Sequence, residues 1–565
     1  MSLTAPVAAS LPRLAALLPG RRDYDGLRAG WGNDLVAGVT VAVVALPLAL
    51  AFGVASGAGA TAGLVTAVVA GAVAAVLGGS HLQVSGPTGA MAVILVPIVA
   101  EHGVGSVATI ALLAGLLVAG AGVLGLGRLV GLIPWPVVEG FTLGIALVIG
   151  LQQVPMALGV DPPHGENAAL DAARSAGRFM QHPHLAVVGL LVLAVTLTAL
   201  LPRLHRSLPA GLLAVAVTTV VAAASGADVA VIGDLPRTLP APTAPDLTHV
   251  ATLLSPAVAV AAMAALESLL SARVADGMAD LPRHDPNREL VGQGLANVAS
   301  SMFGGLPATG AIARTAVNAR AGASTRFAAL AHAAVLAVLM AAAAGVVGRV
   351  PLVALAGVLL VTAYRMVERH TVKAVLHSTR ADAAVFALTA AATIVFDLVV
   401  AVEVGIVVAV VLALVRLSRT ARLVEDDDAV AEIAGEEEHE LLRQHVLVYR
   451  LDGPLFFAAA ARFLAQLTTV SDVRVVVLRL GNLAMLDATG ARVLAEIIEQ
   501  FDDRGIAVVL KVSSPVHVRL LRTVGALDRL DREGHIAADL PSALAHARKH
   551  LLRAAHEPHV GAAAS

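Results

Sequence analysis

The stretches PAVAVAAMAALESLLSARVADG (256–277) and GGLPATGAIARTAVNARAG (304–322) hold two charged residues that are hard to explain inside an apolar protein. Glu267 lies in the middle of the first stretch, and Arg314 lies in the second. An ionised side chain within hydrocarbon costs at least ~2.5 to 3.5 kcal/mol, so such residues usually face a cavity or a partner. We therefore interpret this region as a transport site.

The composition of the whole chain favours a membrane setting. Of 565 residues, 57% are hydrophobic and 14% are charged, and the mean hydropathy is +0.81. A soluble domain has roughly 25% charged residues, so we predict a polytopic α-helical protein in a lipid bilayer. Cysteine is absent, which excludes disulfides and thiolate chemistry. The sequence also has no phosphate loop or metal-ligand motif, so we expect no enzyme activity, cofactor, metal site or nucleic-acid partner.

Fourteen apolar stretches follow one another along the chain, each near the ~20 residues that a helix needs to cross a bilayer. The predicted spans are 34–56, 60–78, 84–100, 105–125, 132–156, 184–201, 208–225, 252–276, 289–304, 309–320, 326–347, 351–366, 381–397 and 400–421. The spans that begin near residues 84 and 309 open with proline and glycine, so we expect them to be partly unwound.

Positive charge separates the two sides of this array. If the amino terminus is inside, the outside connections carry only four cationic residues, whereas the inside segments between residues 21 and 422 carry seventeen. The four are Arg174, Arg178, Arg237 and Arg349. This distribution obeys the positive-inside rule. We therefore predict a multi-pass protein of the cell (inner) membrane, with a cytoplasmic segment 1–33 and both termini in the cytoplasm.

An internal repeat relates the two halves. ALPLALAFGVASG (45–57) matches ALESLLSARVADG (265–277) at six of thirteen positions, and TGAMA (88–92) matches TGAIA (309–313) at almost the same offset. Seven spans separate the copies, so the second copy is upside down relative to the first. An inverted repeat places a binding site near mid-membrane, where discontinuous helices meet.

The repeat also predicts the chemistry of this site. Helices that begin near Thr88 and Thr309 would point their amino ends at each other, and each end offers free N–H groups and about half a positive charge. Two such ends and Arg314 favour an anion. Simple kinks with close helix packing are the alternative, because glycine and proline are frequent in membrane helices. The recurrence of the motif beside charged residues favours the site.

Four motifs resemble the SulP family of anion permeases, also called solute carrier family 26. The motifs are DLVAGVTVAVVALPLALAFGVASG (34–57), HLQVSGPTGAMAV (81–93), ALESLLSARVADGM (265–278) and GLPATGAIARTAVNARAG (305–322). The resemblance implies fourteen spans as seven-plus-seven inverted repeats, about 34–225 and 252–421 within a transport domain 34–423. It also implies a core domain that moves against a gate domain, and a homodimer.

The resemblance further implies an anion site at the ends of the third and tenth spans, with an aromatic residue from the first. The matching positions are Phe52, Thr88, Gly89, Ala90, Gly310, Ala311, Ile312, Ala313 and Arg314. One position departs from the family: Pro47 is followed by Leu48, where the pattern often has glutamine. We therefore expect a substrate held mainly by backbone donors, with sulfate, bicarbonate and dicarboxylates all compatible.

Glu267 matches an acidic position that sodium-dependent bicarbonate carriers of this family use for a cation. Ser271 lies one helical turn later and could add a second oxygen ligand for Na⁺. A carboxylate beside an anion could equally accept a coupling proton, and we favour the proton because one carboxylate and one hydroxyl make a sparse sodium site. The structural alternative pairs Glu267 with Arg273 or Arg314. Five other intramembrane polar residues are interpreted as packing or interfacial groups: Glu139, Gln152, Gln153, Asp397 and Glu403.

The chain after Arg422 changes character. Residues 424–443 form an acidic linker, 444–552 read as a small soluble α/β domain, and 553–565 as a tail. The α/β part resembles the STAS domain that is attached to SulP permeases. In that fold a serine after an aspartate can be phosphorylated, but here Ala488 follows Asp487. We expect Thr489 to cap the next helix, and the domain to serve folding, dimer contacts or a cytoplasmic protein partner.

Two other functions remain open at this level. A nucleobase permease has a related architecture, although Arg314 and the STAS-like domain argue against it. Alternatively, the membrane region is a scaffold and the soluble domain signals.

Overall fold

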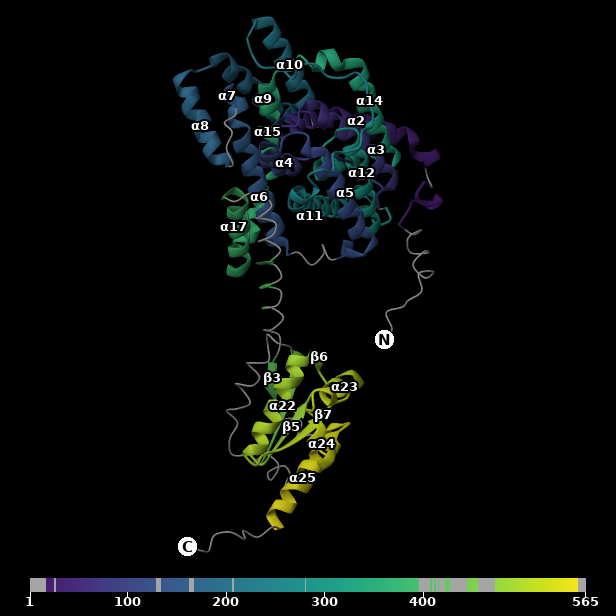
Figure 1. The fold of residues 1–565 in the computed structure, drawn as a ribbon, viewed down its shortest axis with the longest axis vertical. Coiled ribbons are helices and arrows are strands. Elements are labelled where there is room, and N and C mark those ends of the chain that lie inside the picture. Colours follow the sequence, from purple (N-terminus) through teal and green to yellow (C-terminus); the bar gives the residue numbers. More distant parts are fainter. Residues whose placement is uncertain are drawn as a thin grey trace. The chain divides into compact units, whose positions relative to one another are not determined.

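The computed structural model describes residues 17–24, 27–128, 134–161, 167–205, 208–279, 281–395, 407–408, 411–412, 415, 422–426, 445–455 and 473–556. The chain divides into two compact units, Met1–Val407 and Val408–Ser565. The first unit is helical and the second is a sheet covered by helices (Figure 1).

Helices make up almost all of the first unit. They are α2 (Leu27–Ala55), α3 (Ala60–Leu77), α4 (Gly89–His102), α5 (Ser106–Val123), α6 (Trp135–Gln152), α7 (Val154–Leu158), α8 (Ala168–Gln181), α9 (Leu185–Leu204), α10 (Ala210–Ser225), α11 (Val250–Asp276), α12 (Pro286–Met302), α13 (Ile312–Arg320), α14 (Phe327–Val347), α15 (Leu352–Met366), α16 (Arg369–Leu376) and α17 (Arg380–Val395). Among the described residues, seven helices are long and apolar enough to cross a membrane. Each predicted span up to 381–397 corresponds to a helix here, and the span 400–421 lies almost wholly outside the described residues.

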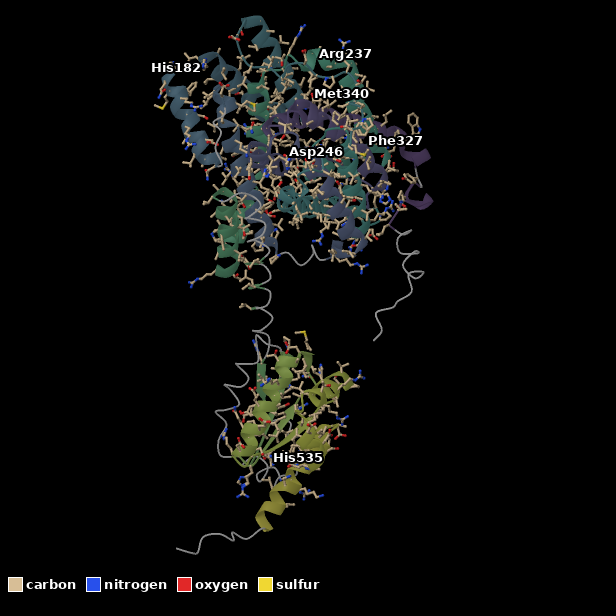
Figure 2. The ribbon with its side chains drawn as sticks, in the orientation of Figure 1. His182, Arg237, Asp246, Phe327, Met340 and His535 are labelled. Carbon is tan, nitrogen blue, oxygen red and sulfur yellow. The ribbon has the colours of Figure 1, made fainter. Side chains whose placement is uncertain are left out.

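Helix α8 was not predicted. Its sequence, AALDAARSAGRFMQ, is too polar for a span, but Asn167 caps its amino end by accepting hydrogen bonds from the N–H groups of Ala169 and Leu170. Its buried face consists of Ala172 and Ser175. His182, labelled in Figure 2, follows the last residue of α8 and is exposed.

Helix packing repeats between the two halves of this unit. The pair α2–α14 has its counterpart in α11–α5, the pair α5–α12 in α14–α3, and the pair α6–α17 in α15–α9. In every case a helix of one half packs against a helix of the other. Each of these contacts between the two halves therefore occurs twice, the second time with the helices of the two halves interchanged, as an inverted repeat requires. They also separate a core group, α2–α5 with α11–α14, from a gate group of α6, α9, α10, α15 and α17.

The core group is held by a close crossing of α5 and α12. A methyl group added at Gly115 would lie 2.7 Å from the carbonyl oxygen of Gly294. Small residues let membrane helices approach backbone to backbone, where van der Waals packing replaces the missing hydrophobic driving force. This crossing holds α12 against the discontinuous segments described below.

The second unit is one six-stranded sheet. Its strands are β3 (Arg422–Glu425), β4 (Val446–Leu455), β5 (Val475–Arg479), β6 (Leu483–Leu486), β7 (Ala507–Lys511) and β8 (Ile536–Ala537), in the order β3-β4-β5-β7-β8 with β6 beside β4. Only β3 is antiparallel to its neighbour among these described strands. Its helices are α22 (Ala488–Asp503), α23 (Pro515–Thr523), α24 (Asp528–Glu533) and α25 (Leu540–His556).

Alternating residues of β5 supply both faces of the sheet. Val476 and Leu478 pack in the cluster that contains α22, whereas Val475 and Val477 pack in the cluster that contains α25. A helix layer on each face explains why this strand is hydrophobic throughout.

The soluble unit requires two corrections to the predictions. The acidic linker was expected from residue 424, but Arg422–Glu425 pair with β4, so the sheet begins before that boundary. Thr489 was expected to cap α22, but the carboxylate of Asp487 accepts the hydrogen bond from the Gly490 N–H at 2.7 Å. An aspartate two residues earlier already occupies the capping position.

Candidate functional site

Two short extended segments cross at the centre of the helical unit. The strands β1 (Ser85–Gly86) and β2 (Thr309–Gly310) pair antiparallel, with Ser85 opposite Gly310 and Gly86 opposite Thr309. Only Pro87 and Thr88 separate β1 from helix α4, and only Ala311 separates β2 from α13. The pairing therefore brings the amino ends of two half-length helices together, as the repeat predicted.

Glu267 lies at this junction and joins the two halves. Its Oε2 accepts hydrogen bonds from the hydroxyl of Thr88 at 2.8 Å and from the hydroxyl of Thr309 at 2.7 Å. These threonines are the equivalent residues of the TGAMA and TGAIA motifs. One carboxylate thus bridges the starts of α4 and α13. Neither Arg273 nor Arg314 forms an ion pair with Glu267 in the part of the chain that the structure describes, and Arg273 is exposed.

Arg314 extends from α13 to the segment before α4. Its Nη2 donates to the carbonyl oxygen of Pro87 at 2.6 Å, and the side chain is buried. Gly86 makes this approach feasible, because a methyl group there would lie 2.6 Å from Nη1 of Arg314. Nη1 is buried without a hydrogen-bond partner among the described residues. A buried donor of this kind is available to a bound anion or water.

Phe52 and Ile149 cover the start of α4. A methyl group added at Gly89 would lie 3.3 Å from Cε1 of Phe52 and 2.5 Å from Cδ1 of Ile149. Phe52 belongs to the core group, whereas Ile149 lies on α6 of the gate group. The amino end of α4 therefore faces the boundary between the two groups of helices.

A cavity of about 720 Å³ opens along the same boundary. Its walls include the carboxyl ends of α2, α4 and α6 and the start of α9, with Val148 and Leu151 within two residues of Ile149. None of the predicted substrate residues lines it. The cavity is therefore separate from the predicted substrate residues, on the side expected to face outward.

The remaining predicted residues are placed as follows. Ala90, Gly310 and Ala311 are buried at the junction, while Ile312 and Ala313, in the first turn of α13, are exposed. Ala311 provides no side-chain cap, so the first N–H groups of α13 are left to other partners.

Ser271 contacts a hydroxyl of α13. Its hydroxyl shares a hydrogen bond with the hydroxyl of Thr315 at 3.1 Å, and Thr315 also accepts from the Val84 N–H. Ser271 thus fastens α11 to α13. The hydroxyls that contact Glu267 come from other segments, and the role of Ser271 as a ligand for Na⁺ stays a prediction. Ser268, which was not predicted, accepts from the Gly310 N–H at 3.1 Å.

A polar face of α12 holds both extended segments and was also missed. Asn297 brackets Ala308 by donating to its carbonyl oxygen at 2.9 Å and accepting from its N–H at 2.7 Å. Gln293 donates to the Ser85 hydroxyl, and Glu289 accepts from the Gly79 N–H at 2.7 Å. The recurrence of polar residues every four positions, at 289, 293 and 297, would have indicated this face.

These features define a class of protein: a membrane carrier in which two opposed half-helices meet in an inverted repeat. The sequence comparisons give its family. The sulfate permease family profile matches residues 32–389, and the STAS domain profile matches residues 441–543. The chain belongs to the sulfate permease family, and it is a transporter and not an enzyme.

Relatives and solved structures agree with this assignment. The Bacillus subtilis protein YvdB, provisionally named a sulfate transporter, is 36% identical over 83% of this chain and 89% of its own. The transmembrane domain of the cyanobacterial bicarbonate transporter BicA is 31% identical, with a TM-score of 0.62, and covers 67% of this chain and 98% of that domain. Murine solute carrier 26 family member A9, an anion transporter, has a TM-score of 0.82 at 16% identity over 97% of this chain and 96% of its own, which shows the shared fold.

Proposed function

We propose that this chain is a secondary active transporter of small inorganic or organic anions that works by alternating access. The observation that carries the proposal is the junction of α4 and α13, where Glu267 bridges Thr88 and Thr309 and Arg314 contacts Pro87. The half-positive ends of two helices and a buried guanidinium attract an anion, and the relatives named for sulfate and bicarbonate agree with that substrate class.

We further propose that a proton on Glu267 couples transport to the proton gradient. An ionised carboxylate within the same junction would repel the incoming anion, and the low-dielectric setting makes this repulsion stronger than in water. Protonation removes the repulsion and frees the hydroxyls of Thr88 and Thr309 to donate elsewhere. Binding of the anion and of the proton would therefore favour each other.

A sodium-coupled bicarbonate symporter is the second candidate. Glu267, Thr88 and Thr309 place one carboxylate and two hydroxyl oxygens together, which is a richer set of oxygen ligands than the sequence suggested. An anion exchanger, which needs no coupling cation, is the third.

Uptake into proteoliposomes distinguishes these mechanisms. Labelled sulfate, bicarbonate and fumarate would be tested with a proton or a sodium gradient imposed separately, for the wild type and Glu267→Gln. Stimulation by the proton gradient that disappears in Glu267→Gln supports the proposal, and stimulation by sodium alone supports the second candidate. Glu139→Gln is the matched control, because Glu139 is also intramembrane but accepts from the Trp135 indole N–H.

Equal uptake by wild type and Glu267→Gln under every gradient would contradict coupling through this residue and favour exchange. Absence of any anion flux, with retained binding of a soluble partner, would favour the scaffold function.

We also propose the finer features of its cellular setting. The distribution of arginine and lysine supports an inner-membrane location with both termini in the cytoplasm. The family resemblance supports a homodimer, with the STAS domain available for dimer contacts or for a cytoplasmic protein partner.

A further inference from the structure

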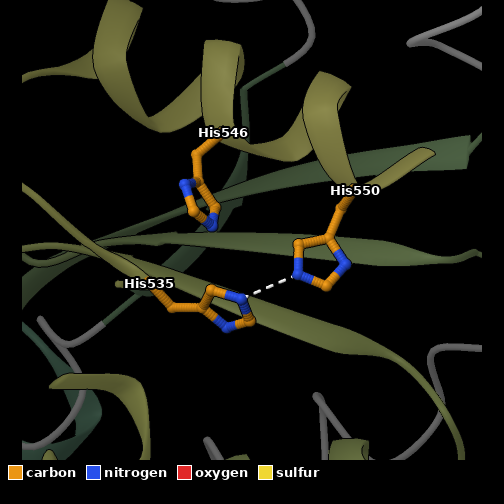
Figure 3. Close-up of side chains that lie close together, drawn as sticks. All are labelled: His535, His546 and His550. Carbon is orange, nitrogen blue, oxygen red and sulfur yellow. Dashed lines mark hydrogen bonds between the residues drawn. The ribbon is translucent and has the colours of Figure 1, made fainter. Parts of the chain in front are cut away.

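Three histidines of the soluble unit gather beside β8, the edge strand of its sheet (Figure 3), and Figure 2 labels one of them, His535. His535 lies in the connection between α24 and β8, and His546 and His550 lie one turn apart on α25. His535 is buried and the other two are half-buried. The spacing of four places the helical pair on one face, next to Ala547 and Leu551, which pack against the sheet.

The three imidazoles have the separations of a metal site. One ring nitrogen from each residue lies within 4.8 Å of the others, and Nε2 of His535 is 2.8 Å from Nε2 of His550. The ring centroids are 4.7, 4.9 and 5.8 Å apart. A tetrahedral Zn²⁺ with Zn–N bonds of ~2.0 to 2.1 Å would place its ligand nitrogens about 3.3 Å apart and the ring centroids roughly 5 Å apart. Small side-chain rotations therefore suffice to form the site.

The groups around His535 hold its ring in place. Oε2 of Glu533 lies 3.4 Å from Nδ1 of His535, on the side of the ring away from His550. A carboxylate at the second nitrogen of a histidine is the usual way to orient a metal ligand and raise its basicity. Arg529 donates to Glu533 at 2.8 Å and holds that carboxylate in turn.

We propose that His535, His546 and His550 form a binding site for Zn²⁺ or a similar divalent transition metal. Imidazole is a preferred ligand for these ions, and three protein ligands leave a fourth position for water or an exchangeable group. The metal would join the connection before β8 to α25, so it would fasten the last helix to the edge of the sheet. This site is separate from the anion junction and does not depend on the proposed transport mechanism.

The test uses the full-length chain in detergent or nanodiscs, purified without a histidine tag and stripped with a chelator. Co²⁺ is added as a spectroscopic probe, and Zn²⁺ affinity is measured by competition with a chromophoric chelator. We expect one equivalent per chain, with the intense visible bands of tetrahedral Co²⁺. His546→Gln and His550→Gln each remove one metal ligand. Loss of a residue that only orients a ligand typically lowers metal affinity ~10- to 100-fold, so each variant should lower Zn²⁺ affinity by at least that factor.

Two further variants separate ligation from folding. His550→Cys keeps a ligand at this position, so it should still bind Co²⁺ and should add a thiolate-to-metal charge-transfer band. His517→Gln, which removes a histidine of α23 in the same unit, should bind as the wild type does. Absence of tetrahedral Co²⁺ bands in the wild type would overturn the proposal. So would equal affinity in wild type, His546→Gln and His550→Gln, which would leave the cluster as a hydrogen-bonded histidine network.

Discussion

The hydroxyl of Thr88 lies 3.5 Å from the hydroxyl of Thr309, its counterpart in the inverted repeat. Both donate to the same oxygen of Glu267, although Thr88 and Glu267 are 179 residues apart in the chain. The two repeats therefore meet at one carboxylate, which both half-helices contact as they begin. This relationship makes the transport site sensitive to changes in either half.

Removing either hydroxyl should impair transport by a similar amount. A hydrogen bond to a charged group is worth ~1.5 to 3 kcal/mol, so Thr88→Val and Thr309→Val should each lower uptake by at least about tenfold. The double variant should lose less than the sum of the two free energies, because both act on one oxygen. Initial rates in proteoliposomes measure the effect. Thr362→Val is the control, since among the described residues the Thr362 hydroxyl bonds within its own helix, to the Val358 carbonyl, and a comparable loss there would count against the site.

Arg314→Gln should weaken anion binding more than it slows turnover. The variant removes the buried positive charge that contacts the Pro87 carbonyl, and truncating one partner of a buried charge interaction costs about 2 to 5 kcal/mol. The expected result is a KM raised by tenfold or more for every transported anion. Arg273→Gln removes an exposed arginine of α11 and should leave KM unchanged. If both variants transport as the wild type does, Arg314 is not part of the anion site.

Gly310→Ala should disrupt the crossing of β1 and β2. A methyl group at this position would overlap Nε2 of Gln83, whose side-chain amide is buried. We expect a loss of uptake and a lower melting temperature, with partial recovery of both in Gly310→Ala combined with Gln83→Ala. Gly345→Ala, in α14, is the control because a methyl group there has open space around it. No difference between the two alanine variants would show that the crossing tolerates a side chain.

Acid should weaken the anchoring of the amino-terminal segment. Burial by itself raises the pKa of Asp23, but hydrogen bonds from Arg288 and the Gly20 N–H, with the charges of Arg288 and Arg326, lower it below the usual value of 3.8. A carboxylate with a lowered pKa stabilises the folded state above its unfolded pKa, and this contribution is lost as the pH falls through the folded value. Asp23→Asn should therefore lower the melting temperature at pH 7 and have a smaller effect below about pH 4. An equal effect at both pH values would contradict the role of this ion pair.

Much of the membrane fold could be predicted from local patterns. The spans, the partly unwound segments near 84 and 309, and the inverted repeat follow from hydropathy, proline and glycine, and the TGAMA and TGAIA motifs. Helix α8 was missed because its amphipathic sequence lacks the apolar length of a span. The polar face of α12 was missed although its four-residue spacing was visible. Such residues can be recognised from sequence, but their partners cannot.

Hydropathy and repeated motifs can be recognised in short segments of the chain. The sequence by itself therefore determined that this chain is a membrane protein with an inverted repeat and an attached α/β domain. Tertiary structure alone decided that Glu267 contacts Thr88 and Thr309, that Ser271 turns to Thr315, and that three histidines meet beside the last strand. Each of these contacts depends on which faces of the helices pack together and on how far the helices are shifted along their axes. That choice depends on close packing of many side chains distant in the sequence, and no local pattern encodes it.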